Sequence, residues 1–160
     1  MSLLRSPVYP DPHADEGHHE FTYSLYPHGG DWKQALTIRE GYQLNYKLIP
    51  LAVEKHQGTL PPEHSFLQVP SENVIVSAIK KAEDGNALIV RLYEWAGKRG
   101  DVTVQLPPGA ESARDTDLME KPVGSLPVNG GTVKLPIKPY EIKTVEVQFS
   151  NMPGTMAEKP

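Results

Sequence analysis

The sequence predicts an all-β protein: an antiparallel, immunoglobulin-like β-sandwich preceded by further strands and one short helix. Seven short stretches after residue 63 have the composition and alternation of strands, and turn residues separate them at roughly 8 to 12 residue intervals, as in small β-sandwiches. The chain also has 16 prolines and 13 glycines in 160 residues, which suits short strands and many turns. The predicted strands are residues 64–69, 74–80, 87–94, 101–106, 113–118, 132–137 and 142–149.

The chain begins with two further predicted strands, residues 3–5 and 19–26, on either side of a proline-rich loop. In the second strand His19, Phe21, Tyr23 and Leu25 alternate with more polar neighbours, so they lie on one face. This pattern predicts a half-buried strand.

A helix is predicted over residues 32–45, because apolar and long side chains recur there at helical spacing. Asp31 is its predicted N-cap, since its carboxylate can accept the free N–H groups of a first turn. Residues 46–53 follow as a strand that is broken at Pro50.

Residues 54–63 are polar, with a glycine and a double proline, and they predict a linker. We therefore expect a domain boundary near residue 60: a first region over 1–60, a small sandwich over 61–150 and a flexible tail over 151–160. Because Met1-Ser2 leads directly into a strand, the chain is expected to be a fragment of a longer protein.

The composition argues against several classes of protein. A net charge of −4 gives no reason to expect nucleic acid or an anionic membrane as a partner. The chain contains no cysteine, which excludes disulfides and a thiolate nucleophile. It has no apolar run of about 20 residues and no secretory signal pattern, so the cytoplasm is the expected compartment.

An acidic, histidine-containing patch near the N-terminus is the candidate metal site of the sequence. Its members are Asp11, His13, Asp15, Glu16, His18 and His19. His18 and His19 are adjacent on a predicted strand and point to opposite faces, so they cannot both reach one ion. We expect a solvated loop in which Asp11 and Asp15 accept backbone N–H groups, and no metal site.

Glycosidases need a pair of carboxyl groups about 5 to 9 Å apart, and the available candidates are Asp11, Asp15, Glu20 and Asp31. Surface carboxylates are ordinarily just solvated, so we expect none of them to be catalytic. The sequence also contains no GxGxxG, P-loop, nucleophile elbow or HExxH motif.

Aromatic and basic residues supply the candidate binding site. Arg5 has two interpretations, a contact with sugar or an ion pair with Asp11 or Asp15, and the ion pair is favoured. For His28, a role in satisfying buried carbonyl groups at a turn is favoured over binding. Trp32, at the start of the helix, is expected in the core, whereas Trp95, beside a Gly-Lys-Arg-Gly turn, is expected to be an exposed platform for a sugar ring.

Two motifs near the N-terminus point to a known family. LLRSPxxPDPxAD begins at residue 3, and GxHxFTYxLYPHxGDW begins at residue 17. They resemble the C-terminal β-domain region of the glycoside hydrolase family 38 α-mannosidases, most closely the bacterial and cytosolic type. VIVSAIKKAEDGNALIVRLYEWAG (74–97) and KPYEIKTVEVQF (138–149) resemble the final small sandwich of the same family.

This resemblance implies that residues 1–60 are the closing strands and helix of a β-supersandwich. It also implies that the whole enzyme removes terminal α-linked mannose with retention. The carboxylate nucleophile, the acid/base and a divalent metal, zinc or cobalt, would belong to an upstream barrel domain, leaving no catalytic residue, metal ligand or cofactor in this chain.

The expected partners are that upstream catalytic domain and a mannoside substrate, with a homo-oligomer formed through unpaired strand edges as a further expectation. The candidate substrate-rim or sugar-binding residues are Arg5, His19, Tyr23, His28 and Trp95. Two alternatives stay open: a free-standing carbohydrate-binding module that uses Trp95, Tyr93 and Tyr140, or an immunoglobulin-like interaction domain with an exposed apolar patch.

Overall fold

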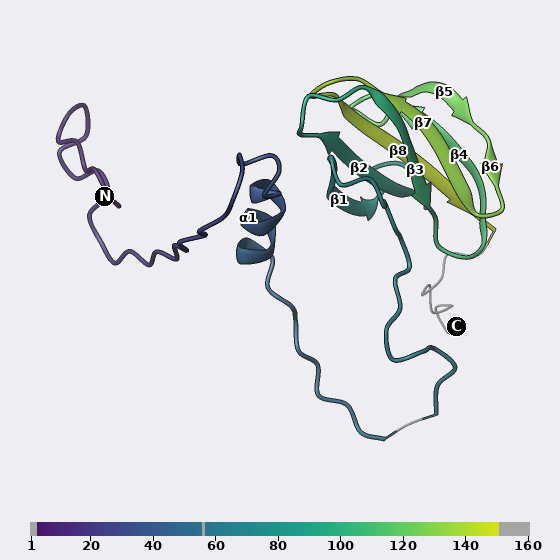
Figure 1. Ribbon diagram of the computed structural model, residues 1–160, viewed down its shortest axis with the longest axis horizontal. Helices are drawn as coiled ribbons and strands as arrows, with labels where there is room; N and C mark the ends of the chain where they lie inside the picture. The colour runs from purple at the N-terminus through teal and green to yellow at the C-terminus, as the bar shows by residue number, and fades with distance from the viewer. Residues whose placement is uncertain (1–2, 56, 151–160) are drawn as a thin grey trace.

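The computed structural model describes residues 3–55 and 57–150 of the chain, and its C-terminal half is a β-sandwich of two antiparallel sheets (Figure 1). Five strands form the larger sheet, in the order β1 (Val74–Lys81), β2 (Leu88–Glu94), β8 (Ile142–Phe149), β4 (Ala110–Thr116) and β5 (Pro122–Leu126). Three strands form the smaller sheet, in the order β3 (Gly100–Gln105), β7 (Thr132–Ile137) and β6 (Val128–Asn129). The predicted all-β sandwich with one short helix is thereby confirmed.

The core lies between the two sheets and is made by alternate side chains of the central strands. Val90 of β2 lies opposite Val145 of β8 in the ladder, and both are fully buried. Leu135 of β7 is buried in the same cluster. The β-branched side chains that dominate this core suit a pleated surface with one packed face.

A two-residue glycine turn joins β6 to β7. Gly130 and Gly131 have φ values of 56° and 75°, and Asn129 pairs with Thr132 on either side of them. A tight hairpin turn of this kind needs positive φ at both central positions, which glycine adopts without a steric penalty.

Six of the seven strands predicted after residue 63 are confirmed, with boundaries shifted by up to three residues. The strand predicted over residues 64–69 is wrong, because its pairing is limited to an isolated bridge between Gln68 and Gln105. Strands β5 and β6 were not predicted from the sequence. Pro122 and Gly124 weaken the strand signal of β5, and β6 has two residues.

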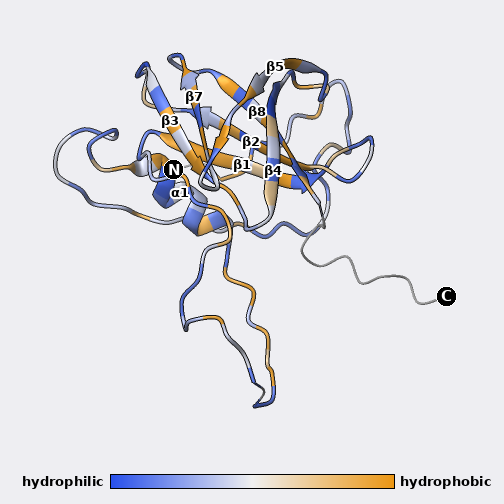
Figure 2. Ribbon diagram, turned by 90° about the vertical axis from the view of Figure 1, so that its right-hand side faces the viewer, coloured by the Kyte–Doolittle hydropathy of each residue, from blue (hydrophilic) through white to orange (hydrophobic). Residues whose placement is uncertain are grey.

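The strands predicted over residues 3–5, 19–26 and 46–53 are wrong, because these segments are extended chain outside any sheet. Residues 3–30 lead away from the sandwich, and residues 46–55 and 57–73 follow a wide path outside the sheets (Figure 1). Leu25 is 90% exposed and Leu48 is 96% exposed, and the orange stretches of the protruding loop in Figure 2 are such apolar residues. A strand needs a neighbouring strand for its ladder of backbone hydrogen bonds, and neither sheet of the described residues includes these segments.

The single helix of the described residues, α1, spans Thr37–Asn45 and is shorter than the predicted helix over 32–45. Asp31 does accept the backbone N–H groups of Lys33 and Gln34, at 2.9 and 2.8 Å, but it caps the turn that precedes α1. Leu36 lies between the turn and the helix with φ 52°, and it occupies the N-cap position without a side-chain hydrogen bond. The left-handed backbone at Leu36 divides the predicted helix. Within the described ranges, no helix combines the length and apolarity needed to cross a membrane.

Helix α1 packs on the outer face of the five-stranded sheet. Ile75 and Trp95 form a buried cluster there with Ala96, and Leu36 and Ile38 from the helix segment pack against it. Ile75 neighbours Val74 along β1, and Val74 belongs to the inner core, so Ile75 faces outward. The helix predicted as part of the first region therefore contacts the sandwich directly, whereas the boundary predicted near residue 60 stays a prediction.

Candidate functional site

The five predicted binding residues do not converge. Arg5, His19, Tyr23 and His28 are exposed along the extended N-terminal segment, and Trp95 lies in the sandwich. The His19 Nε2 atom lies 2.7 Å from the carbonyl oxygen of its neighbour Asp15 in the loop. That these residues bind a sugar stays a prediction.

Two local expectations for this segment are wrong. Arg5 forms no ion pair with Asp11 or Asp15 within the described residues. His28 is exposed and contacts the carbonyl oxygen of its neighbour Gly29 at 3.3 Å, so it satisfies no buried carbonyl group. The His28 prediction assumed that the turn is buried, and residues 28–30 are exposed.

The acidic, histidine-containing loop is a solvated turn. Asp11 Oδ1 accepts the backbone N–H of His13 at 2.9 Å, as predicted, while His13 Nδ1 lies 3.1 Å from Glu16 Oε1. Asp15 takes part through its carbonyl oxygen and not, as predicted, through its carboxylate. Across residues 3–55 and 57–150, no three His, Asp or Glu side chains are arranged to hold a metal ion.

The two tryptophans exchange their predicted environments. Trp95, expected to be an exposed platform, is 6% exposed, while Trp32, expected in the core, is 46% exposed. Their ring centroids are 5.9 Å apart with an interplanar angle of 44°, and the Trp95 indole N–H donates to the carbonyl oxygen of Glu72 at 3.0 Å. Trp95 is buried because the turn before α1 folds over it, a contact between residues 63 positions apart that no local pattern reveals.

We call the contact of residues 31–45 with the start of β1 and the turn after β2 the junction. Glu94 is its central polar residue and was not among the residues predicted from the sequence. It is 1% exposed. Its Oε1 atom accepts from Asn73 Nδ2 at 3.0 Å and from the Ala96 N–H at 2.9 Å, and Oε2 accepts from the N–H groups of Gly97 and Tyr140 at 2.8 and 3.0 Å. One carboxylate thus fixes the start of β1, the turn after β2 and the turn before β8.

The electrostatic state of Glu94 follows from these contacts. Burial by itself raises the pKa of the carboxyl group, but the hydrogen bonds from Tyr140, Asn73 and Gly97 favour the charged form and lower the pKa to about 2. A general acid needs a pKa near the operating pH. Glu94 is therefore a structural anion.

Two cations attach the helix segment to the sandwich. Arg39 of α1 donates from Nε to the carbonyl oxygen of Glu72 at 2.9 Å and from a terminal nitrogen to those of Ser71 and Val74 at 2.8 and 3.1 Å. Lys33 donates from Nζ to the carbonyl oxygen of Ala96 at 2.6 Å. These carbonyl groups lie before or at the start of β1, or after the end of β2, where the ladder ends and leaves acceptors free.

Tyrosines complete the contact of α1 with the sheet. The Tyr93 hydroxyl donates to that of Tyr42 at 3.2 Å. Burial and this hydrogen bond raise the pKa of Tyr93 to about 12, so it stays protonated at neutral pH. Tyr46, 70% exposed, stacks on Tyr42 at 5.4 Å between ring centroids.

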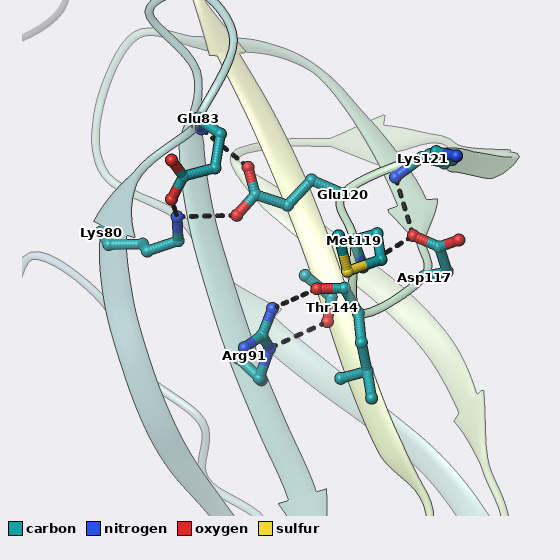
Figure 3. A network of polar contacts seen from close by, with 9 residues as sticks. Lys80, Glu83, Arg91, Asp117, Met119, Glu120, Lys121 and Thr144 are labelled. Carbon is teal, nitrogen blue, oxygen red and sulfur yellow. Dashed lines mark hydrogen bonds and ion pairs between the residues drawn. The ribbon is translucent and has the colours of Figure 1, made fainter.

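A second polar network lies over β1, β2 and β8 of the same sheet (Figure 3). Glu120 lies 2.8 Å from Lys80 Nζ and accepts the backbone N–H of Glu83. Arg91 donates to the carbonyl oxygen of Leu118 at 3.1 Å. The hydrogen bond from Lys80 lowers the pKa of Glu120, and the reciprocal bond raises the pKa of Lys80. Leu118 and Glu120 belong to the loop between β4 and β5, so their contacts with Arg91 and Lys80 hold that loop over the sheet. The network therefore has a structural role.

The junction also contains a cleft, which we call the junction cleft, of about 410 Å³. It lies between the turn before α1, the start of β1 and the turn after β2. Its lining residues are Asp31, Lys33, Gln34, Leu36, Glu72, Asn73, Trp95, Ala96 and Lys98. Of the predicted binding residues, Trp95 is the one that lines it.

Comparisons with known proteins agree with this architecture. Residues 73–145 match the family described as the glycosyl hydrolases family 38 C-terminal beta sandwich domain. The chain is 34% identical over 160 residues to Alpha-mannosidase 2C1 of Mus musculus, a match that covers 96% of this chain and 15% of the mouse protein. It is 38% identical over 150 residues to Alpha-mannosidase G of Dictyostelium discoideum, covering 90% of this chain and 14% of that protein. With the Alpha-mannosidase of Saccharomyces cerevisiae it shares 31% over 175 residues, covering 93% of this chain and 16% of the yeast protein.

Over residues 73–145 the chain matches, in fold and in sequence, the C-terminal beta sandwich domain of the glycosyl hydrolases family 38. The resemblance of the chain to the C-terminal region of family 38 α-mannosidases is confirmed. The chain spans 14–16% of the length of the three relatives compared above.

Proposed function

We propose that this chain is the non-catalytic C-terminal β-region of an α-mannosidase, an enzyme that hydrolyses terminal α-D-mannosyl residues of glycans or oligosaccharides with retention. The observation that carries the proposal is the coverage of the matches. Between 90 and 96% of this chain aligns with the three α-mannosidases, but it accounts for 14–16% of each of them. Most of such an enzyme therefore lies outside the sequence described.

The buried carboxylates of the sandwich support the non-catalytic role. A retaining glycosidase needs two carboxyl groups about 5 to 5.5 Å apart, one of them with a raised pKa. Glu94 has a lowered pKa and is held by four hydrogen bonds. Glu146 is held by Arg114 through two hydrogen bonds of 2.9 and 2.7 Å.

Under this proposal, the catalytic carboxylates and the zinc or cobalt ion belong to the upstream domain. The described histidines and carboxylates of this chain do not fit a metal site, because no three of them converge. No step of the reaction is assigned to residues of this chain, and the cytoplasm is the proposed location of the enzyme.

The extended segments suggest how the region serves the enzyme. Leu25, Leu48 and Ile49 are 90 to 96% exposed, and apolar side chains of this kind are stabilised by burial against another surface. The proposed surface is the upstream catalytic domain of the same polypeptide. The sandwich then supports that domain, and Arg5, His19, Tyr23 and His28 contribute to the rim of its substrate cleft and to subunit assembly.

Hydrolysis of 4-nitrophenyl α-D-mannoside by the 160-residue chain tests the proposal. We expect no turnover at high protein concentration, with or without zinc or cobalt, while circular dichroism shows a folded, β-rich protein. Metal-dependent turnover that is lost in Asp11→Asn or Asp15→Asn would instead make the acidic loop an active site.

The parent enzyme tests the supporting role. Leu25→Asp together with Leu48→Asp is expected to lower the thermal stability and activity of the full-length enzyme but to leave the free chain unchanged. Val123→Asp is the matched control, because Val123 is 69% exposed on β5. Full activity and stability of the Leu25/Leu48 double variant of the enzyme would contradict burial of these residues upstream.

A further inference from the structure

We infer that the junction cleft, which is lined by residues of this chain, binds a neutral saccharide. The inference goes beyond the proposed function, because it concerns binding by this chain alone. Lys33 and Gln34 before α1, Asn73 before β1 and Trp95 after β2 bring their side chains to this one cleft.

The polar groups of the cleft are held in place before any ligand arrives. Asp31 Oδ1 accepts the N–H groups of Lys33 and Gln34, and Gln34 Oε1 accepts the N–H of Asp31 at 3.1 Å. Asn73 is held by Glu94, and Lys33 by the carbonyl oxygen of Ala96. A site whose side chains are already ordered loses less conformational entropy when a ligand binds.

Several of these side chains keep unused hydrogen-bonding capacity. The second carboxylate oxygen of Asp31 and the amide oxygen of Asn73 are hydrogen-bond acceptors. In the described part of the chain, neither oxygen accepts a hydrogen bond. The amide NH₂ of Gln34 and the ammonium of Lys98 are donors that likewise have no hydrogen-bond partner among the described residues. Acceptors and donors therefore line the cleft together.

The donors, acceptors and charges of both signs in the cleft favour one class of ligand. An anion would meet the carboxylates of Asp31 and Glu72, and a cation would meet the ammonium groups of Lys33 and Lys98. A sugar hydroxyl both donates and accepts, so a neutral polyol can satisfy donors and acceptors without a like-charge contact.

The remaining walls suit a ring with apolar C–H faces. Leu36 lines the cleft with an apolar side chain, and the mostly buried Trp95 and Ala96 border it; such apolar surface favours contact with the C–H groups of a ligand. The indole nitrogen of Trp95 is already engaged with Glu72, which fixes the orientation of the ring. The volume of about 410 Å³ lies within the usual range for small-molecule sites.

Titration of the 160-residue chain with methyl α-D-mannoside and α-linked mannobiose, followed by ¹H–¹⁵N NMR, tests the inference. The chain has two tryptophans, so the indole signals report Trp95 and Trp32 separately. We expect saturable shifts of the Trp95 indole and of the side-chain amides of Gln34 and Asn73. Each of Gln34→Ala and Lys98→Ala should weaken binding about five- to tenfold, as expected for the loss of one hydrogen bond.

Matched controls are Gln43→Ala and Lys134→Ala, which remove exposed side chains on α1 and β7 outside the cleft and should leave affinity unchanged. An absence of saccharide-dependent shifts in the folded chain would overturn the inference. So would stronger binding of phosphate or acetate than of sugar, lost in Lys98→Ala, because that result describes an anion site. Neither result bears on catalysis, since hydrolysis is measured in a different assay.

Discussion

Two parts of this molecule carry the same kind of sequence pattern and have different structures. Residues 19–26 alternate between apolar and polar side chains, as does β2, yet the first segment is extended chain and β2 is a central strand. Strand β2 has a hydrogen-bonded neighbour on each side, β1 and β8. Leu92 of β2 is fully buried and Leu25 is 90% exposed. Alternation therefore specifies which face a strand could bury, and a neighbouring strand decides whether it forms.

The largest difference between these parts is expected for leucine truncation. Leu92→Ala leaves a cavity in the core between the sheets and should lower the free energy of unfolding by about 2 to 5 kcal/mol. Leu25→Ala removes an exposed side chain and should change it by no more than about 0.5 kcal/mol. Urea denaturation of both variants gives the comparison. Similar losses in both would show that residues 19–26 are packed in solution.

Acid should destabilise the sandwich through Glu94. The folded-state pKa of Glu94 is about 2 and its ordinary value is 4.5, so the folded state favours the charged carboxylate. That stabilisation is complete above pH 4.5 and is lost as the pH falls from 4.5 towards 2. The difference between these two pKa values corresponds to roughly 3 kcal/mol in the free energy of unfolding.

Denaturant midpoints of the wild type, Glu94→Gln and the exposed control Glu111→Gln, measured from pH 7 to pH 2.5, check this expectation. Glu94→Gln should be less stable at pH 7, and its difference from the wild type should shrink towards low pH. A difference that stays constant with pH would mean that the Glu94 carboxylate does not titrate with a lowered pKa.

A moderate effect is expected where the helix joins the sandwich. Arg39→Ala removes three hydrogen bonds to backbone carbonyl groups before and at the start of β1 and should cost about 2 kcal/mol. The control is Lys47→Ala, which removes an exposed cation from the extended segment after α1. Hydrogen exchange should quicken in residues 37–45 of the Arg39 variant. Unchanged protection there would show that α1 is held by its apolar contacts alone.

The sequence predicted well where structure depends on local pattern. The alternation of side chains at β2 and β8 predicted two central strands, and the Asn-Gly-Gly turn after residue 128 separated two predicted elements. It failed where a distant partner decides the outcome. Residues 19–26 and 46–53 have strand composition without a strand partner, and Trp95 is buried by Trp32, 63 residues earlier.

The junction could be predicted only in part for the same reason. Trp95 was identified by residue type, and Asp31 by its capping pattern. The roles of Lys33, Arg39 and Glu94 depend on carbonyl and N–H groups left free where strands end. Nothing in the spacing of these residues indicates which strand ends they reach. The available signal is the position of Glu94 in β2, on the same face as Val90 and Leu92, because a carboxylate on a core face is rare unless it is paired.

The smallest effect is expected at the turn after β2, where two glycines can be compared. Gly97 and Gly85 both have positive φ, 78° and 82°. An alanine at either position is strained by about 1 to 2 kcal/mol. A Cβ at Gly85 meets open space, whereas one at Gly97 lies 2.6 Å from the Tyr140 hydroxyl oxygen. The Tyr140 side chain is 65% exposed and can swing away, so Gly97→Ala should cost about 0.5 kcal/mol more than Gly85→Ala.

A double-mutant cycle isolates this small term. The extra cost of Gly97→Ala should disappear in a Tyr140→Ala background, where the ring is absent, while the cost of Gly85→Ala should be the same in both backgrounds. Thermal unfolding of the four variants and the two backgrounds measures it. If the extra cost persists without Tyr140, it comes from the hydrogen bond between the Gly97 N–H and Glu94, and the turn is then held by the buried carboxylate and not by the aromatic contact.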